Sequence, residues 1–220
     1  GPGCGKSSFM RRIGEAASGK GLDVEYIHCS GDPDSLDAVY IPELHVGFVD
    51  ATAPHACEPA NFAYNSDYVN LGRFCGRVDD PRIAQMTDKY RAMYKTAYAY
   101  LAAAGSVANA EIPGLISEET RQKVRKRAQS AAERELGRVN EACAAAQVRR
   151  CFMRCISCKG ELVLADDIKK LCKRIYLLDD RCGFADIYLK QLHAEAKERG
   201  MGSISCLSPL CPDRFDALLL

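Results

Sequence analysis

The first eight residues constrain this chain more than any other stretch. They read Gly1-Pro2-Gly3-Cys4-Gly5-Lys6-Ser7-Ser8. Gly5, Lys6 and Ser7 fill the last three places of the phosphate-binding pattern Gly-x-x-x-x-Gly-Lys-Ser/Thr. Glycines let successive backbone N–H groups face one anion, and a following helix adds the positive end of its dipole. The sequence therefore predicts that all eight residues bind the phosphates of a nucleoside triphosphate.

Two side chains of this loop have predicted roles in chemistry. The Lys6 ammonium would reach the outer phosphates, and the Ser7 hydroxyl would be a ligand of Mg²⁺. We therefore expect ATP, or alternatively GTP, together with Mg²⁺ as the cofactors.

An acid after an apolar stretch is the second candidate. Residues 44–50 are predicted as a strand that ends in Asp50. In phosphate-loop proteins an Asp at such a place meets the magnesium shell, so Asp50 is predicted as a metal ligand and catalytic residue. It could equally cap the next turn. Ala51 stands where many ATPases carry a water-activating Glu, and His55 is a candidate base because its pKa suits proton transfer.

The order of predicted elements favours an α/β fold. A helix over 7–18, a strand over 24–29, a turn over 30–35 and the strand over 44–50 are typical of a parallel sheet. We predict a P-loop NTPase parallel sheet with crossover helices over residues 1–80, its first strand missing. Asp34 or Ser35 is expected to cap a short helical turn.

Two long helical patterns follow. Apolar residues recur at helical spacing over 81–104, and Ser117 is placed to cap a second helix that continues toward residue 146. We predict a helical hairpin inserted over residues 81–150. Its basic run, 121–127, is expected to be a solvated face, since the net charge of +1 gives no support for a nucleic-acid partner.

Composition limits the class of protein. No run of about 18 apolar residues is present, so no membrane span is expected. The chain lacks an initiator Met and a signal peptide, so we expect a cytoplasmic protein and a segment of a longer chain. Three of the twelve cysteines, Cys151, Cys155 and Cys158, have the spacing of a radical S-adenosylmethionine iron–sulfur loop. Too few residues follow for the barrel of such enzymes, and zinc is an alternative with Cys172 or Cys182. Free thiols are the favoured interpretation.

The end of the chain repeats its beginning. Residues 34–41 match 213–220, and residues 26–29 match 203–206 if the second loop holds two extra residues. A second module would then cover residues 159–220, with a strand over 174–178 and a loop over 179–186.

That second loop lacks the groups that bind phosphate. Phe184 stands in place of the lysine and Ala185 in place of the serine, while Asp179, Asp180 and Asp186 would repel an anion. We predict a degenerate P-loop-like module that does not bind nucleotide.

Several of these stretches together are similar to a known family. They are Gly1 to Ser7, His28-Cys29, Asp32 to Asp37, Ile41 to Leu44 and Asp50 to His55. With them, nearly the whole chain resembles an uncharacterised family of bacterial ATP-binding proteins, usually described as ATPases, with two tandem phosphate-loop modules. The resemblance implies the fold and ATP binding. Members commonly keep an intact second loop, from which this chain departs.

The predicted function is Mg²⁺-dependent binding of ATP or GTP with slow hydrolysis. A nucleotide or small-molecule kinase is the alternative enzyme, in which Asp32, Asp34 or His55 would face the acceptor hydroxyl. A non-catalytic, nucleotide-gated scaffold with an unknown protein partner is a third hypothesis, favoured by Ala51 and by the degenerate second loop.

Overall fold

A computed structural model describes residues 3–52, 64–76, 80–110, 116–137, 147–180 and 182–220. Two compact units make up the chain. The first contains residues 1–84 and 156–160, and the second contains residues 85–155 and 161–220.

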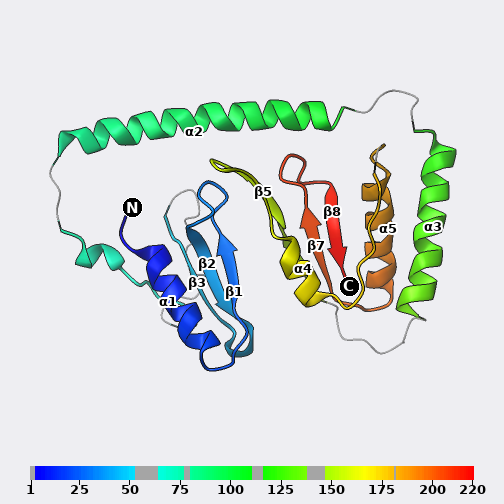
Figure 1. Cartoon of the computed structure of the whole chain (residues 1–220), viewed down its shortest axis with the longest axis horizontal. Coiled ribbons are helices and arrows are strands. Elements are labelled where there is room, and N and C mark those ends of the chain that lie inside the picture. Colours follow the sequence, from blue (N-terminus) through cyan, green and yellow to red (C-terminus); the bar gives the residue numbers. More distant parts are fainter. Residues whose placement is uncertain (1–2, 53–63, 77–79, 111–115, 138–146, 181) are drawn as a thin grey trace. The chain divides into compact units, whose positions relative to one another are not determined.

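The first unit is one helix on a small antiparallel sheet (Figure 1). Its elements are α1 (Lys6–Ser18), β1 (Glu25–His28), β2 (Leu36–Ile41), β3 (Val46–Val49) and two short 3-10 helices, Pro42–Leu44 and Leu71–Phe74. Met10 of α1 is buried against Leu36 and Val39 of β2. Phe9 packs edge-on to Phe48, with ring centroids 5.8 Å apart. This apolar contact holds the helix on the sheet.

The second unit holds the remaining elements. They are α2 (Pro81–Ala108), α3 (Glu118–Leu136), β4 (Val148–Cys151), β5 (Arg154–Ser157), β6 (Gly160–Val163), α4 (Ala165–Leu171), α5 (Phe184–Glu198), β7 (Ser203–Leu207) and β8 (Phe215–Leu219). β4 pairs in parallel with β7, and β7 pairs antiparallel with β8. The β5–β6 hairpin includes residues of both units.

The helical segments differ in how they pack. α3 packs along α5 and buries Ala128, Ala131 and Ala132. In α2, by contrast, Gly105 is the one buried residue among those described. The predicted strand over 174–178 is wrong, because these residues form no regular element.

The predicted P-loop parallel sheet with crossover helices is also wrong. The described strands form three separate sheets of two or three strands, and in the first of them β2 pairs antiparallel with both β1 and β3. The connections over residues 29–35 and 42–45 are too short for crossovers, since a parallel pair needs a dozen or more linking residues. The expected helical turn after Asp34 is instead β2, whose Leu36, Val39 and Ile41 are buried.

The internal repeat is confirmed as a duplicated helix–hairpin unit. β1–β2 and β7–β8 share one register: Ile27 faces Ala38 as Cys206 faces Ala217, and both hairpins have a bulge just after this pair. Counterparts lie 179 positions apart (206 minus 27) throughout the hairpin. The two extra residues expected in the second loop are therefore absent, and that part of the sequence alignment was wrong.

Matching turns confirm the correspondence. The Cys29 amide donates to the Ser35 carbonyl, and its counterpart Ser208 donates to the Arg214 carbonyl. The frame of the repeat is therefore set by equivalent backbone hydrogen bonds, although most side chains differ.

Candidate functional site

The loop before α1 has a backbone that favours glycine. Gly3 and Gly5 have φ angles of 81° and 76°, in the left-handed region that other residues rarely adopt. A Cβ at either position would meet no atom within 4 Å, so the backbone conformation and not crowding requires glycine. Gly5 is the N-cap of α1 and, as a glycine, has no side chain that could accept hydrogen bonds from the first amides of the helix. The predicted binding residues Gly1 and Pro2 lie outside the described residues.

Lys6 and Asp50 come together at the start of α1. The Lys6 Nζ lies 3.6 Å from Asp50 Oδ2, and their side chains are 24% and 15% exposed. Asp50 follows β3, and its amide donates to the Asp37 carbonyl at 2.7 Å, which fixes its backbone beside β2. The sequence thus predicted two residues that the fold places in contact.

The Asp50 carboxylate is held in its charged form. Burial opposes the charge, but hydrogen bonds from Thr52 and the nearby Lys6 ammonium outweigh it, so the pKa of Asp50 is lowered. The Thr52 amide donates to Asp50 Oδ1 at 2.8 Å. Thr52 therefore orients the carboxylate from the backbone.

Ser7 is engaged with β2. Its Oγ accepts a hydrogen bond from the Leu36 amide at 3.2 Å, and this contact ties the first turn of α1 to the sheet. Ser8, the next residue, is exposed.

The oxygen donors near α1 suit Mg²⁺ only in part. Ser7 and Asp50 provide one hydroxyl and one carboxylate, and Mg²⁺ in nucleotide sites takes one or two such ligands besides phosphate oxygens and water. Within the described part of the chain, no group of three or more His, Cys, Asp or Glu residues could hold a metal ion. One hydroxyl and one carboxylate are too few to hold Mg²⁺ without further oxygen ligands.

A second thiol lies near the loop and was not predicted. The Cys75 side chain, just after the 3-10 helix Leu71–Phe74, hydrogen-bonds to Cys4, which lowers the pKa of Cys4 and raises that of Cys75. No pattern in the sequence links these two positions.

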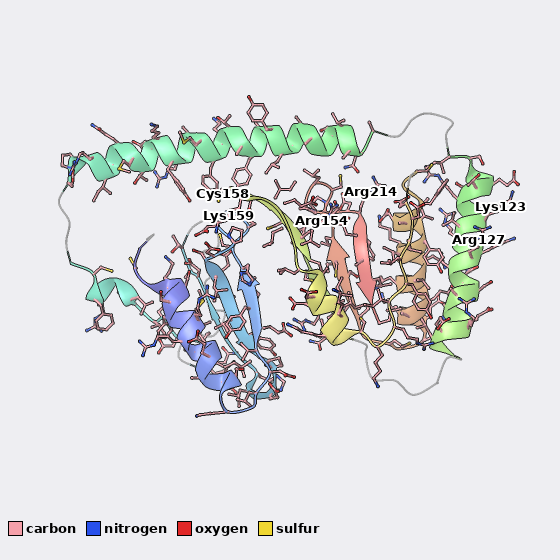
Figure 2. All side chains as sticks on the ribbon, in the orientation of Figure 1. Lys123, Arg127, Arg154, Cys158, Lys159 and Arg214 are labelled. Carbon is pink, nitrogen blue, oxygen red and sulfur yellow. The ribbon has the colours of Figure 1, made fainter. Side chains whose placement is uncertain are left out.

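The residues proposed to face a kinase acceptor have other contacts. Asp32 Oδ2 accepts from the Ser35 hydroxyl at 2.7 Å and closes its own turn. Asp34 pairs with Lys159, whose hydrogen bond lowers the pKa of Asp34; Figure 2 labels Lys159 in the β5–β6 turn. His55 lies outside the described residues.

The three spaced cysteines have different surroundings. Cys151 on β4 lies beside Cys206 on β7, with sulfur atoms 3.6 Å apart. Cys155 is half-buried on β5, and Cys158 is exposed in the following turn.

The loop before α5 has the same backbone but different chemistry. Gly183, like Gly5, is a left-handed N-cap, with φ 78°. Here Asp180 Oδ1 accepts from the Phe184 amide at 2.8 Å, so a carboxylate of the chain already occupies the helix end. The prediction that Ala185 replaces Ser7 is wrong: Asp186 is the structural counterpart of Ser7, because its Oδ1 accepts from the Phe215 amide at 2.8 Å as Ser7 Oγ accepts from the Leu36 amide.

Comparisons with known proteins give no relative. No protein-family description, curated protein or solved structure matches the chain. Among the described residues, no helix has the length and apolar character required to cross a bilayer.

Proposed function

We propose that the chain binds a nucleoside triphosphate, ATP or GTP, with Mg²⁺, through the loop before α1. The contact between Lys6 and Asp50 at the start of this helix is the observation that carries the proposal. It joins a cation for phosphate to a carboxylate for a metal, next to a helix end whose N-cap residue, Gly5, has no side chain to cap it.

The residues of the chain divide the work of binding. Backbone N–H groups of the first turn of α1 face the phosphates, and Lys6 neutralises their charge. Asp50 and the Ser7 hydroxyl would hold Mg²⁺. The metal supplies charge neutralisation at the outer phosphates.

The Lys6–Asp50 pair implies an exchange of partners. When a triphosphate binds, Lys6 would leave Asp50 for the phosphate oxygens, and the Asp50 carboxylate would then be available to hold Mg²⁺. Asp50 should therefore lower the nucleotide affinity when Mg²⁺ is absent and raise it when Mg²⁺ is present. Hydrolysis would be slow, because Ala51 supplies no base next to Asp50.

The test is a titration with a fluorescent ATP analogue, with and without Mg²⁺. Lys6→Ala should weaken binding by roughly tenfold or more, since a charge-assisted contact contributes about 1.5–3 kcal/mol. Lys20→Ala removes an exposed lysine just beyond the other end of the helix and serves as the matched control.

Asp50→Asn tests the exchange. It should strengthen binding without Mg²⁺, because Lys6 loses its competitor, and abolish the gain that Mg²⁺ gives. Unchanged affinity in Lys6→Ala would refute nucleotide binding at this loop. An Asp50→Asn variant that still gains affinity from Mg²⁺ would refute the metal role alone.

A further inference from the structure

Helix α2 exposes an unusually regular apolar face. Eight small or apolar residues recur at alternating spacings of three and four, which is the a and d pattern of a coiled coil. They are Ile83, Met86, Tyr90, Met93, Ala97, Tyr100, Ala104 and Val107. All eight are exposed. Four successive heptads of this pattern fill the helix, which is about 40 Å long at 1.5 Å per residue.

The contact that α2 makes with its own unit lies elsewhere on the helix. Gly105 is buried against the Leu210 carbonyl, where an added Cβ would come within 2.5 Å. Val107, two residues further along, is 77% exposed, Tyr100 is 74% exposed and Met86 is 70% exposed. The anchored side and the apolar face are therefore different sides of one helix.

Three tyrosine rings stack along α2 and restrict one another's motion. The rings of Tyr90 and Tyr94 lie 4.6 Å apart, and those of Tyr94 and Tyr98 lie 5.9 Å apart. Tyr90, on the apolar face, is thereby held by its neighbours one turn away, which reduces the entropy lost on docking.

We propose that this face pairs with α2 of a second copy of the chain, as an antiparallel two-stranded coiled coil. If a full side chain offers about 150–250 Å², the exposed fractions of the larger a and d residues amount to roughly 750 Å². A stable interface buries about 800 Å² per partner. The face of one α2 is therefore large enough for a dimer without other surfaces.

Side-chain size favours the antiparallel direction. In that direction Met93 faces Ala97 of the second copy and Met86 faces Ala104, so large residues meet small ones. In the parallel direction each alanine would face itself and leave a gap, while each methionine would meet a methionine. Layers that alternate large and small residues pack better.

Charge favours the same direction. Every charged residue of α2 lies between Arg82 and Lys95, none lies in the last 13 residues of the helix, and four of the five are basic. Two parallel helices would place these basic halves together, whereas antiparallel helices place each one beside an uncharged half. Like charges side by side destabilise pairing.

The test is sedimentation equilibrium of the chain over a concentration series up to on the order of 100 µM, well above the micromolar dissociation constant of a modest interface. We expect a dimer. Met93→Glu puts an unpaired charge in the interface and should raise the dissociation constant by more than about 100-fold, because an isolated charge is costly to bury. Ala102→Glu makes the same charge change on the opposite side of the helix and should leave the dimer intact.

The direction is tested by mixing two variants. Met93→Glu and Ala97→Lys should each be monomeric, and a mixture should form heterodimers, because these positions share a layer only in the antiparallel pair. Circular dichroism verifies that the helix remains. A monomeric chain at every concentration, a dimer insensitive to Met93→Glu, or equal dissociation by Ala102→Glu would overturn the proposal. A mixture that stays monomeric would overturn its antiparallel form.

Discussion

The two helix–hairpin repeats share a frame and differ at the helix end. Gly5 and Gly183 adopt the same left-handed conformation, and both hairpins have the same register. In the first repeat the helix start carries Lys6 beside Asp50, whereas in the second Asp180 caps the helix itself. The comparison shows that one left-handed glycine conformation can precede helix starts that carry different charged groups.

The repeats also exchange large and small residues within their cores. In the first, Gly14 of α1 lies against the Tyr26 ring of β1. Its counterpart in the second is His193, and the counterpart of Tyr26 is the buried Ser205. The ring is supplied by the strand in one repeat and by the helix in the other. The His193 ring itself lies against the Ser203 hydroxyl and edge-on to the Phe215 ring.

The largest expected difference is in nucleotide affinity. The second loop lacks a lysine equivalent and presents Asp180 to the helix end, so its affinity should be weaker by well over tenfold, given about 1.5–3 kcal/mol for one charge-assisted contact. Isothermal titration calorimetry should give one nucleotide per chain.

Removing the cap sharpens this prediction. Asp180→Ala frees the Phe184 amide but supplies no cation, so the stoichiometry should remain one. Two sites of similar affinity, or binding that persists in Lys6→Ala, would mean that the second loop is functional.

The second prediction transplants a core residue between repeats. Gly14→His would drive a side chain into the Tyr26 ring, since even a Cβ would lie 2.4 Å from the Tyr26 hydroxyl. Overpacking of this kind costs about 1–3 kcal/mol of unfolding free energy. Ala16→His, on the exposed side of α1, is the control.

A double variant tests whether the residue changes at positions 14 and 26 compensate for each other. Gly14→His with Tyr26→Ser gives both positions the residue types of the second repeat. It should recover part of the loss, because the serine removes the ring that the new histidine would meet; the recovery is measured as a coupling energy in urea unfolding. Strictly additive losses would show that the exchange between repeats is not compensatory.

Local patterns in the sequence predicted the local elements well. The helical period gave α1 and α2 close to their observed bounds, and the apolar stretch over 24–29 gave β1. It gave the start of α3 at the Ser117 cap, but the predicted continuation toward residue 146 was wrong, because α3 ends at Leu136 before Gly137. The repeat was also visible, because Asp34 to Ala38 and Asp213 to Ala217 share their acids and alanine. The meeting of Lys6 with Asp50 agreed with the motif.

The direction in which the strands pair was not predicted from the sequence. Leu36 to Ile41 was missed as a strand because a turn-rich stretch precedes it, and its presence makes the sheet antiparallel. The first strands of the two hairpins were aligned two residues out of register. Their similar residue types suggested one match, whereas the strand pairing and the bulge define another. The Cys75 contact with the Cys4 loop depends on tertiary structure and has no local pattern.

The third prediction compares the contacts that tie each helix to its hairpin. The charged Asp186 carboxylate accepts a hydrogen bond from the Phe215 amide and also pairs with Lys190, whereas the neutral Ser7 hydroxyl accepts a hydrogen bond from the Leu36 amide. Hydrogen bonds to charged groups contribute about 1.5–3 kcal/mol and neutral ones about 0.5–1.5 kcal/mol. Asp186→Ala should therefore destabilise the chain by about 1 kcal/mol more than Ser7→Ala in the same unfolding assay. Equal losses would show that the charge adds nothing at this position.

The smallest effect is a pH dependence confined to the second repeat. His193 has a lowered pKa, first because it is partly buried and then because Lys197 and Arg150 are nearby. Its Nδ1 lies 3.1 Å from the Ser203 hydroxyl. The unfolded chain thus binds a proton at His193 more readily than the folded chain. Stability is complete above the unfolded pKa of about 6.5 and falls as the pH drops below it.

Gly14, the counterpart of His193 in α1, cannot titrate. The stability of the second repeat should therefore fall on acidification more than that of the first. Hydrogen exchange, corrected for intrinsic rates, should show the Cys206 amide of β7 losing protection between about pH 7 and pH 5, as the unfolded-state pKa of His dictates. The β1 amide at Ile27 provides the internal reference, because it is the counterpart of Cys206. His193→Gln should remove the difference in pH dependence between the two amides. If that difference survives in the variant, the acid sensitivity of the second repeat comes from another group.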